Sequence, residues 1–315
     1  MAGSSSIRES RYHVRSISFP PRSNPIALKI EEELNKLNIT WDISSSSNIS
    51  TLKSETIQLE LVGLVELYNS VDDLIHSPLT QKALCDHRHE KLVEEVVDES
   101  VRLLDVCGTA RDFLLMMKEG VQDLQSALRR KSGGESSVEA KVGAYIRLRK
   151  KVKKDINKCV GALKRMIVNN NKIVSSDLIL DQDQHLSVVV RVLREVSLIT
   201  MSIFRSLLLF MSAQPRSSRW SLVSKLLHKG QVASCCDQEA EESNNEVASA
   251  DVAVQALCDQ HISSKDGKVE RVQIKLAQKR LKALEVSIED VEEGVGCIYK
   301  RLIKTRVTLL NIFTH

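Results

Sequence analysis

The apolar residues near the end of the chain are spaced three and four positions apart, and this spacing constrains the fold more than any other feature. The steps alternate without a miss through Ile274, Ala277, Leu281, Leu284, Ile288, Val291, Val295, Ile298, Leu302, Thr305, Leu309 and Ile312. Such steps place the side chains on one face of an α-helix. The 39 residues from 274 to 312, at about 1.5 Å each, make a rod about 58 Å long. A rod of this length has to pack beside other long helices or pair with a second copy of the chain.

The same helical period recurs upstream. From Leu103 the apolar positions again step by threes and fours, through Val106, Ala110, Phe113, Met117, Val121, Leu124 and Leu128. Gly108 lies inside this run at a cost of about 1 kcal/mol relative to Ala, which leaves room for a local break there. Further helices are predicted at 23–38, at about 52–76, from Pro78 with Ser77 as its cap, over the basic stretch that ends at 169–172, and at 185–213.

No segment shows the sustained alternation that is typical of a β-strand. We therefore predict an all-α protein, an elongated bundle of long, mostly antiparallel helices. Residues 1–24 are expected to form a disordered basic arm, and residues 25–230 the first part of the bundle, with a polar joint at 42–50. Residues 231–268 are expected to be an acidic flexible linker that has room for a short helix. Residues 269–315 are expected to form a long C-terminal helix that packs on the bundle.

The composition is that of a globular protein, with 42% hydrophobic and 27% charged residues. Aromatic residues make up only 3%, which argues against aromatic-lined pockets and stacking platforms for single-stranded nucleic acid. Seven cysteines form no C-x-x-C pair. We interpret them as reduced, mostly buried thiols of an intracellular protein. The apolar run 196–213 is interrupted by Arg205 and diluted by serines, so we predict a buried helix there and not a membrane span.

Several stretches carry a family resemblance. They are "RSISFP" followed by "EEELNKL", then "LYNSVDDLI", "ESVRLLDVCGTARDFLLMMKEGVQDLQSALRR", "FRSLLLFMS" and "RLIKTRVTLLNIF". Together they resemble the plant-specific BYPASS-related family. The resemblance implies a helical fold and a link to root and shoot development. It supplies no enzymatic activity and no catalytic residues to carry over.

The N-terminal arm contains a candidate phospho-docking motif. Arg15, Ser16, Ser18 and Pro20 fit R-S-x-S-x-P, the pattern that 14-3-3 proteins bind once the second serine is phosphorylated. A phosphate there adds nearly two negative charges, which an arginine cluster can hold. Two alternatives remain open. The arm is Ser- and Arg-rich like a plastid transit peptide, and a flexible arm without a partner would have the same composition.

A basic helix suggests an anionic partner. Residues 141–165 hold ten Lys and Arg against one acid. The candidate patch consists of Arg147, Arg149, Lys150, Lys151, Lys153 and Lys154. It suits the phosphates of an acidic membrane or of nucleic acid. A simpler alternative is that the cations form the solvated back of an amphipathic helix. Its apolar face would consist of Tyr145, Leu148, Val152, Ile156, Val160, Leu163 and Ile167. Neutralisation by the acidic residues 237–246 is a third interpretation.

Two cysteine motifs are weaker. Cys235 and Cys236 follow a short amphipathic segment, where acylation would provide a membrane anchor alongside the basic helix. The alternative is a pair of exposed thiols without modification. Cys85, His87 and His89 resemble a metal cluster, but only Cys85 and His89 share a helical face, and zinc needs more ligands than these. The sequence contains no Walker loop, G-x-G-x-x-G, G-x-S-x-G or H-E-x-x-H motif.

We therefore predict a non-catalytic helical scaffold or adaptor without a cofactor, acting through protein–protein contacts and regulated by phosphorylation at Ser18. Its expected partners are proteins, including 14-3-3 proteins, and nucleic acid is not an expected partner. Self-association through the helical seam is a further interpretation. The alternative is a peripheral membrane protein that binds acidic lipid through the basic helix. The expected compartment is the cytoplasm, with a membrane surface or the plastid as the alternatives.

Overall fold

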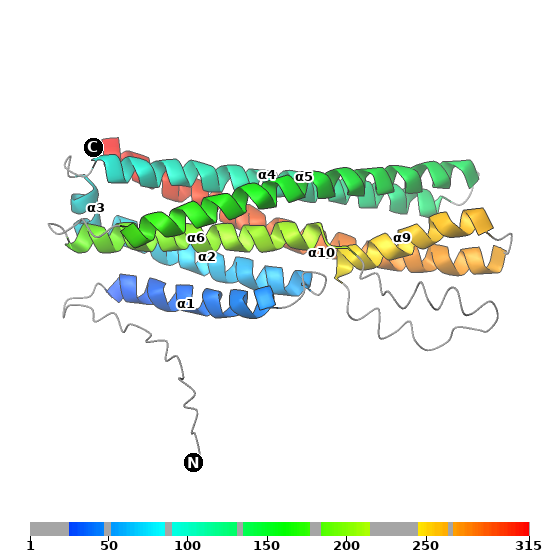
Figure 1. Cartoon of the computed structure of the whole chain (residues 1–315), viewed down its shortest axis with the longest axis horizontal. Coiled ribbons are helices and arrows are strands. Elements are labelled where there is room, and N and C mark those ends of the chain that lie inside the picture. Colours follow the sequence, from blue (N-terminus) through cyan, green and yellow to red (C-terminus); the bar gives the residue numbers. More distant parts are fainter. Residues whose placement is uncertain are drawn as a thin grey trace, which may run out of the picture.

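The structure is a computed structural model that describes residues 25–46, 52–85, 90–130, 135–176, 184–214, 245–263 and 267–314. In these ranges the chain forms helices and no strand, which confirms the all-α prediction. The helices are α1 (Pro25–Ser46), α2 (Ser54–His76), α3 (Pro78–Leu84), α4 (Glu90–Arg129), α5 (Glu135–Ser176), α6 (Gln184–Met211), α9 (Glu246–Ser263) and α10 (Gly267–Thr314). They lie side by side in an elongated bundle (Figure 1).

Helix α10 is the longest element and packs along α4, α2 and α9. Its 48 residues span about 72 Å. It runs antiparallel to α4, because Gln122 contacts Glu285 while Arg306, further along α10, contacts Ser100, earlier on α4. It runs parallel to α2, where Gln58 contacts Asp290 and Asp72 contacts Lys304. The bundle therefore mixes antiparallel neighbours with parallel ones.

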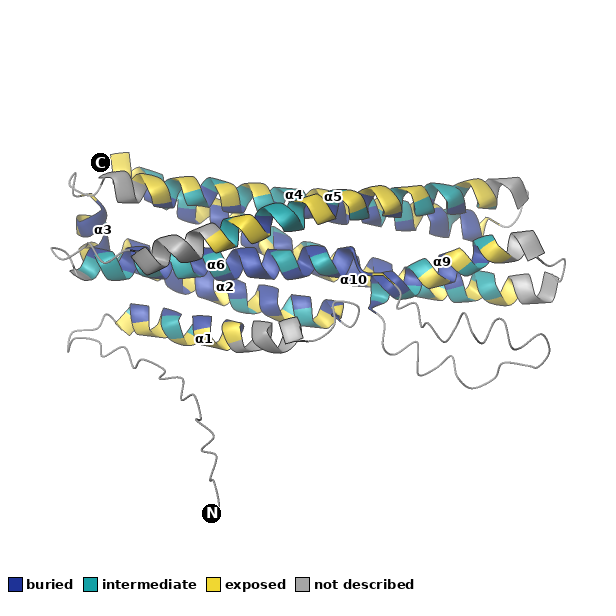
Figure 2. Ribbon diagram, in the orientation of Figure 1, coloured by how far each residue is buried: buried dark blue, intermediate teal, exposed yellow. Residues whose placement is uncertain are grey.

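The face of α10 predicted from the three-and-four spacing is the face that the bundle buries. All its members from Ala277 to Ile312 are buried, and Ile274, at the start, is half-buried. The central residues Leu281, Leu284, Ile288, Val291 and Val295 have no exposed surface. Buried residues line the inward sides of the other helices as well (Figure 2). The seam is thus occupied by helices of the same chain.

Several predicted boundaries hold and others move. Ser77 caps α3 as expected, since its hydroxyl accepts a hydrogen bond from the Thr80 amide at 3.2 Å. Helix α4 continues through Gly108 without a break, because one glycine costs only about 1 kcal/mol while the flanking turns pack. Helix α5 continues past 169–172 to Ser176. The three asparagines are poor helix formers, but no Gly or Pro follows them to stop the helix. Helix α1 likewise extends to Ser46, into the predicted joint.

Residues 231–268 were expected to be an acidic flexible linker with room for a short helix, and a helix lies in the second half of this stretch. Residues 246–263 form α9, which packs against α10 and α5. Its buried residues are mostly small, namely Val247, Ala248, Ala250, Ala253, Val254 and Leu257. Short side chains bring helices close together but give a weak hydrophobic signal in sequence. Asn245 caps α9 by accepting from the Ala248 amide at 2.8 Å. Residues 231–244 and the amphipathic segment 217–229 lie outside the described residues.

Two glycines of α10 make a matched pair for testing how closely the helices pack. A Cβ built on Gly294 would lie 3.0 Å from Cδ1 and 3.3 Å from Cβ of Leu61 on α2. A Cβ built on Gly296 would meet nothing within 4 Å. The glycine at 294 therefore lets α2 approach α10, while the glycine at 296 serves no packing contact.

We expect Gly296→Ala to raise the free energy of unfolding by about 0.5–1 kcal/mol, because Ala restricts the unfolded chain and favours the helix. The same change at Gly294 should lower it by about 1 kcal/mol, since the overpacking against Leu61 outweighs that gain. Urea denaturation of both variants measures the difference. Equal effects at the two positions would show that α2 does not approach α10 this closely.

Candidate functional site

The basic helix α5 presents two chemically different faces. Tyr145, Val152, Ile156 and Leu163 are buried, and Leu148, Val160 and Ile167 are half-buried against the core. This confirms the predicted apolar face. Four of the predicted patch residues, Arg147, Lys150, Lys151 and Lys154, are exposed. The six cations predicted as one patch do not all share this exposed face.

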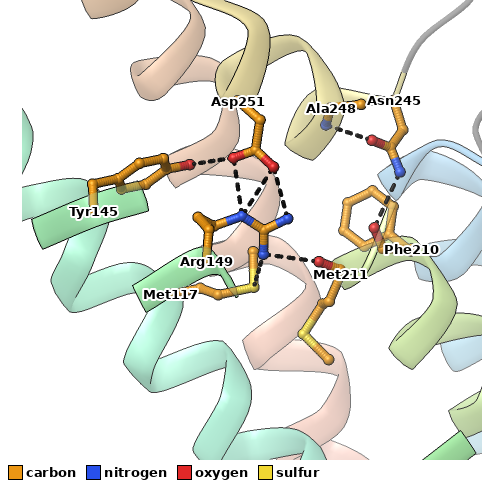
Figure 3. Close-up of polar contacts among 8 residues, drawn as sticks. All are labelled: Met117, Tyr145, Arg149, Phe210, Met211, Asn245, Ala248 and Asp251. Carbon is orange, nitrogen blue, oxygen red and sulfur yellow. Dashed lines mark hydrogen bonds and ion pairs between the residues drawn. The ribbon is translucent and has the colours of Figure 1, made fainter. Parts of the chain in front are cut away.

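Arg149 does not belong to the exposed patch, which corrects the prediction for this residue. Its residue surface is only 6% exposed. The guanidinium forms an ion pair with Asp251 of α9, in which Nε donates to Oδ1 at 2.9 Å and Nη2 donates to Oδ2 at 3.0 Å. Figure 3 shows this pair between α5 and α9. A buried and paired arginine is not available to a phosphate of a partner.

Further contacts make Arg149 the centre of a junction. Its Nη1 donates to the Met211 carbonyl at 3.0 Å, at the end of α6, and lies 3.7 Å from the Met117 sulfur on α4. Tyr145 donates its hydroxyl to Asp251 at 3.0 Å. We call Tyr145, Arg149, Met211 and Asp251 the arginine junction. It connects α5, α6 and α9, and a cation at a helix C-terminus also complements the helix dipole.

The electrostatics of the arginine junction favour the paired state. Burial alone would lower the pKa of Arg149, but the charge of Asp251 and its hydrogen bonds outweigh burial, so the pKa is raised. Burial raises the pKa of Tyr145 well above its ordinary value, and the Asp251 charge adds to this effect. Arg149 therefore stays charged and Tyr145 stays protonated. The cluster is suited to holding helices together and not to exchanging protons.

The residue just before α9 also contacts the end of α6, next to the arginine junction. The Asn245 amide donates to the Phe210 carbonyl at 3.1 Å, one residue before the Met211 carbonyl that Arg149 binds (Figure 3). The last residues of α6 and the first residues of α9 are thereby fixed next to each other. The hydrogen bond between Asn245 and Phe210 therefore joins the two ends of the segment that connects α6 to α9.

Lys153 also differs from the exposed lysines of the predicted patch. It is half-buried, and its pKa is lowered by burial first and then by the charge of Arg149. The predicted patch of six cations therefore divides into four exposed residues, one half-buried lysine and one arginine of the interior.

Two other ionisable groups of the interior, Glu285 and Cys107, also form contacts between helices. Glu285 on α10 accepts hydrogen bonds from Gln122 at 3.0 Å and Gln125 at 3.3 Å, both on α4, and from Lys282 at 2.9 Å. These bonds, with that from Lys282 the largest cause, lower the pKa of Glu285. Burial raises the pKa of Cys107 to about 12, so its thiol stays protonated, and it donates to the Val295 carbonyl at 3.7 Å.

The cysteines are less buried than predicted. All five that lie in the described residues are free thiols, but only Cys107 is buried, while Cys85 and Cys297 are exposed. Cys85 donates to the Ile312 carbonyl at 3.3 Å. His87 and His89, with which Cys85 was compared, lie outside the described residues. Within those residues no group of three or more His, Cys, Asp or Glu side chains could hold a metal ion.

Two other predicted sites cannot be placed in the structure. The phospho-docking motif, Arg15, Ser16, Ser18 and Pro20, precedes the first described residue, and Cys235 and Cys236 lie between α6 and α9. The apolar run 196–213 falls largely within α6, where most of its side chains are buried in the bundle. Of the helices that the structure describes, none combines the length and the apolar character needed to cross a bilayer.

The comparison with protein families identifies the relatives of this chain. The family model described as Protein BPS1 matches residues 60–312, from within α2 to near the end of α10. The chain belongs to the BPS1 family. The matched residues include the arginine junction and the entire α10 seam. Searches of the curated proteins and of the solved structures found no match.

Membership in the BPS1 family confirms the resemblance drawn from the sequence. It fits a family linked to root and shoot development, and this is not a known enzyme family. The arginine junction itself was missed at the sequence level. A signal for it was present, because Tyr145, Arg149, Val152 and Ile156 also step by four and three. Arg149 thus falls within the apolar stripe as readily as Leu148 does.

Proposed function

We propose that this BPS1-family protein is a non-catalytic helical scaffold or adaptor that acts through contacts with other proteins. The observation that carries the proposal is that the ionisable side chains described above in the interior form contacts between helices. The arginine junction and the Glu285 network are hydrogen-bonded between helices, and the seam of α10 is filled by aliphatic side chains. These ionisable groups hold the rod together. The rod offers a long, rigid surface on which partners can be placed.

The proposed switch is the N-terminal arm. The motif R-S-x-S-x-P ends at Pro20, five residues before Pro25, where α1 begins with an exposed residue. The proposal requires that Ser18, which lies seven residues before the exposed Pro25 in the sequence, is accessible to a kinase and to the partner. Phosphorylation of Ser18 would add nearly two negative charges three residues after Arg15. A 14-3-3 dimer provides the arginine cluster that holds such a phosphate.

We expect the full-length protein phosphorylated at Ser18 to bind purified 14-3-3 protein, and Ser18→Ala to weaken that binding by about 100-fold, since charge-assisted bonds to a phosphate are among the strongest polar contacts. Ser16→Ala, two residues away, is the matched control and should retain most of the affinity. Each protein is treated with a basophilic kinase, and titration calorimetry then measures the dissociation constants of wild type, Ser18→Ala and Ser16→Ala for the 14-3-3 protein.

Equal binding by wild type and Ser18→Ala would refute the phospho-docking part of the proposal. For the wider scaffold proposal, chemical cross-linking in plant tissue should connect exposed lysines of the rod to at least one other protein. Cross-links that remain confined to this chain would argue against an adaptor role.

A further inference from the structure

We propose that the outward face of α5 binds the surface of a membrane rich in anionic phospholipid. This face carries six exposed cations, namely Arg147, Lys150, Lys151, Lys154, Lys158 and Arg165. We call them the basic stripe. Their spacing places them along one side of the helix. From residue 147 to residue 165 the stripe extends about 27 Å.

The charge of the basic stripe is largely unpaired within the described part of the chain. Lys158 contacts Asp155 at 3.1 Å, and the structure shows no other ion pair for the stripe in that part. Two cations of α5 outside the stripe are paired with acidic residues of other helices. Lys141 pairs with Asp123 of α4 at 2.8 Å, and Arg149 pairs with Asp251. Like charges three and four residues apart destabilise a helix. An anionic surface that lies along the stripe would relieve this repulsion.

The shape of the surroundings favours a flat partner over a nucleic acid groove. The opposite face of α5 packs on α4, α6 and α9, and the exposed residues form a line along its outer side (Figure 2). The major groove of DNA is about 12 Å wide and admits a single protruding helix. Because α5 packs on three neighbouring helices along its 42 residues, it protrudes too little to suit such a groove, whereas a layer of lipid headgroups can contact the whole line of cations.

Binding of this kind would be electrostatic and reversible. Most apolar side chains of α5 whose burial the structure describes face the bundle, and Val168 is the large one left exposed among them, at 46%, so charge dominates the contact with the lipids. Each basic residue close to an acidic leaflet improves partitioning by about fivefold at low salt. The effect fades as added salt shortens the screening length. The proposal is independent of phosphorylation at Ser18.

Sedimentation of the full-length protein with vesicles tests the proposal. The vesicles are phosphatidylcholine alone or with about 30% phosphatidylserine, at about 0.05 M and 0.3 M salt. The test variant is Lys150→Glu/Lys151→Glu/Lys154→Glu. Its matched control is Lys275→Glu/Lys279→Glu/Lys300→Glu, which makes the same charge change at exposed lysines of α10. Melting temperatures establish that both variants fold.

We expect wild type and control to bind the phosphatidylserine vesicles at low salt, and the stripe variant to lose about tenfold or more in partitioning. If the stripe variant fails to fold, acetylation of wild-type lysines replaces it. Vesicles should then protect Lys150, Lys151 and Lys154 but not Lys275 or Lys279. Equal losses in both triple variants, or uniform protection, would overturn the proposal.

Three other results would also overturn it. One is a wild-type protein that fails to sediment with the anionic vesicles, and another is a wild-type protein that binds duplex DNA more tightly than it binds them. Vesicle binding that appears only after Asp237, Glu239, Glu241 and Glu242 are neutralised would show that the acidic stretch of this chain occupies the stripe instead.

Discussion

Replacing Leu284 with Asp is expected to lower the free energy of unfolding by about 4 kcal/mol or more. Leu284 is fully buried in the middle of the α10 seam. The substitution removes the packing of a large side chain, which costs about 2–5 kcal/mol by itself. It also places a carboxylate where no water or cation compensates it. Thermal and urea denaturation of the full-length protein measure the loss.

Val286→Asp is the matched control for Leu284→Asp. Val286 lies two positions further along the same helix but is 44% exposed. A carboxylate there stays hydrated, so the change in stability should be within about 0.5 kcal/mol. If Leu284→Asp melts at the wild-type temperature, the seam is open to solvent in the free protein and is a surface for another chain.

Arg149→Ala is expected to lower the free energy of unfolding by about 3 kcal/mol. The change leaves the partly buried Asp251 carboxylate without its cation and the Met211 carbonyl without the hydrogen bond from Nη1. Removing one member of a buried ion pair typically costs 3–5 kcal/mol. Urea denaturation measures the effect, and the exposed neighbour Lys150→Ala, expected within about 0.5 kcal/mol of wild type, is its control.

The double variant Arg149→Met/Asp251→Leu separates packing from charge in the arginine junction. Two apolar residues of similar volume leave no unpaired charge, so the double variant should be more stable than Arg149→Ala. A loss for Arg149→Ala below about 1 kcal/mol, or a double variant less stable than Arg149→Ala, would show that the ion pair does not hold α5 to α9.

Helices with strong apolar stripes were readily predicted. The face of α10, the face of α4 and the start of α3 at Ser77 all depend on residues three or four positions apart, and such contacts form within one helix. Helix α9 was harder to place because alanines provide much of its buried face. The C-terminal ends of helices α1 and α5 were also harder to predict, since asparagines and serines weaken a helix without stopping it.

The candidate site shows the same division. Four exposed cations of α5 were identified from the amphipathic pattern, but the buried Arg149 and the half-buried Lys153 were grouped with them. Its partner Asp251 lies 102 positions away on α9. No local pattern reports on a contact over that distance, and a charged residue on the border of an apolar stripe suits either environment. The ion pair could be recognised only once α9 was seen packed beside α5.

The sequence by itself determined that this chain forms long helices, which side of α10 is apolar, and that α5 carries a dense row of positive charge. Those properties follow from the helical repeat and from side-chain chemistry, both of which act over a few residues. Only the tertiary structure decided that α2 runs parallel to α10, that α9 joins the core, and that Arg149 is buried while Lys150 and Lys151 are exposed. These outcomes depend on which helices share buried surface, and that choice is made by packing between residues far apart in the chain.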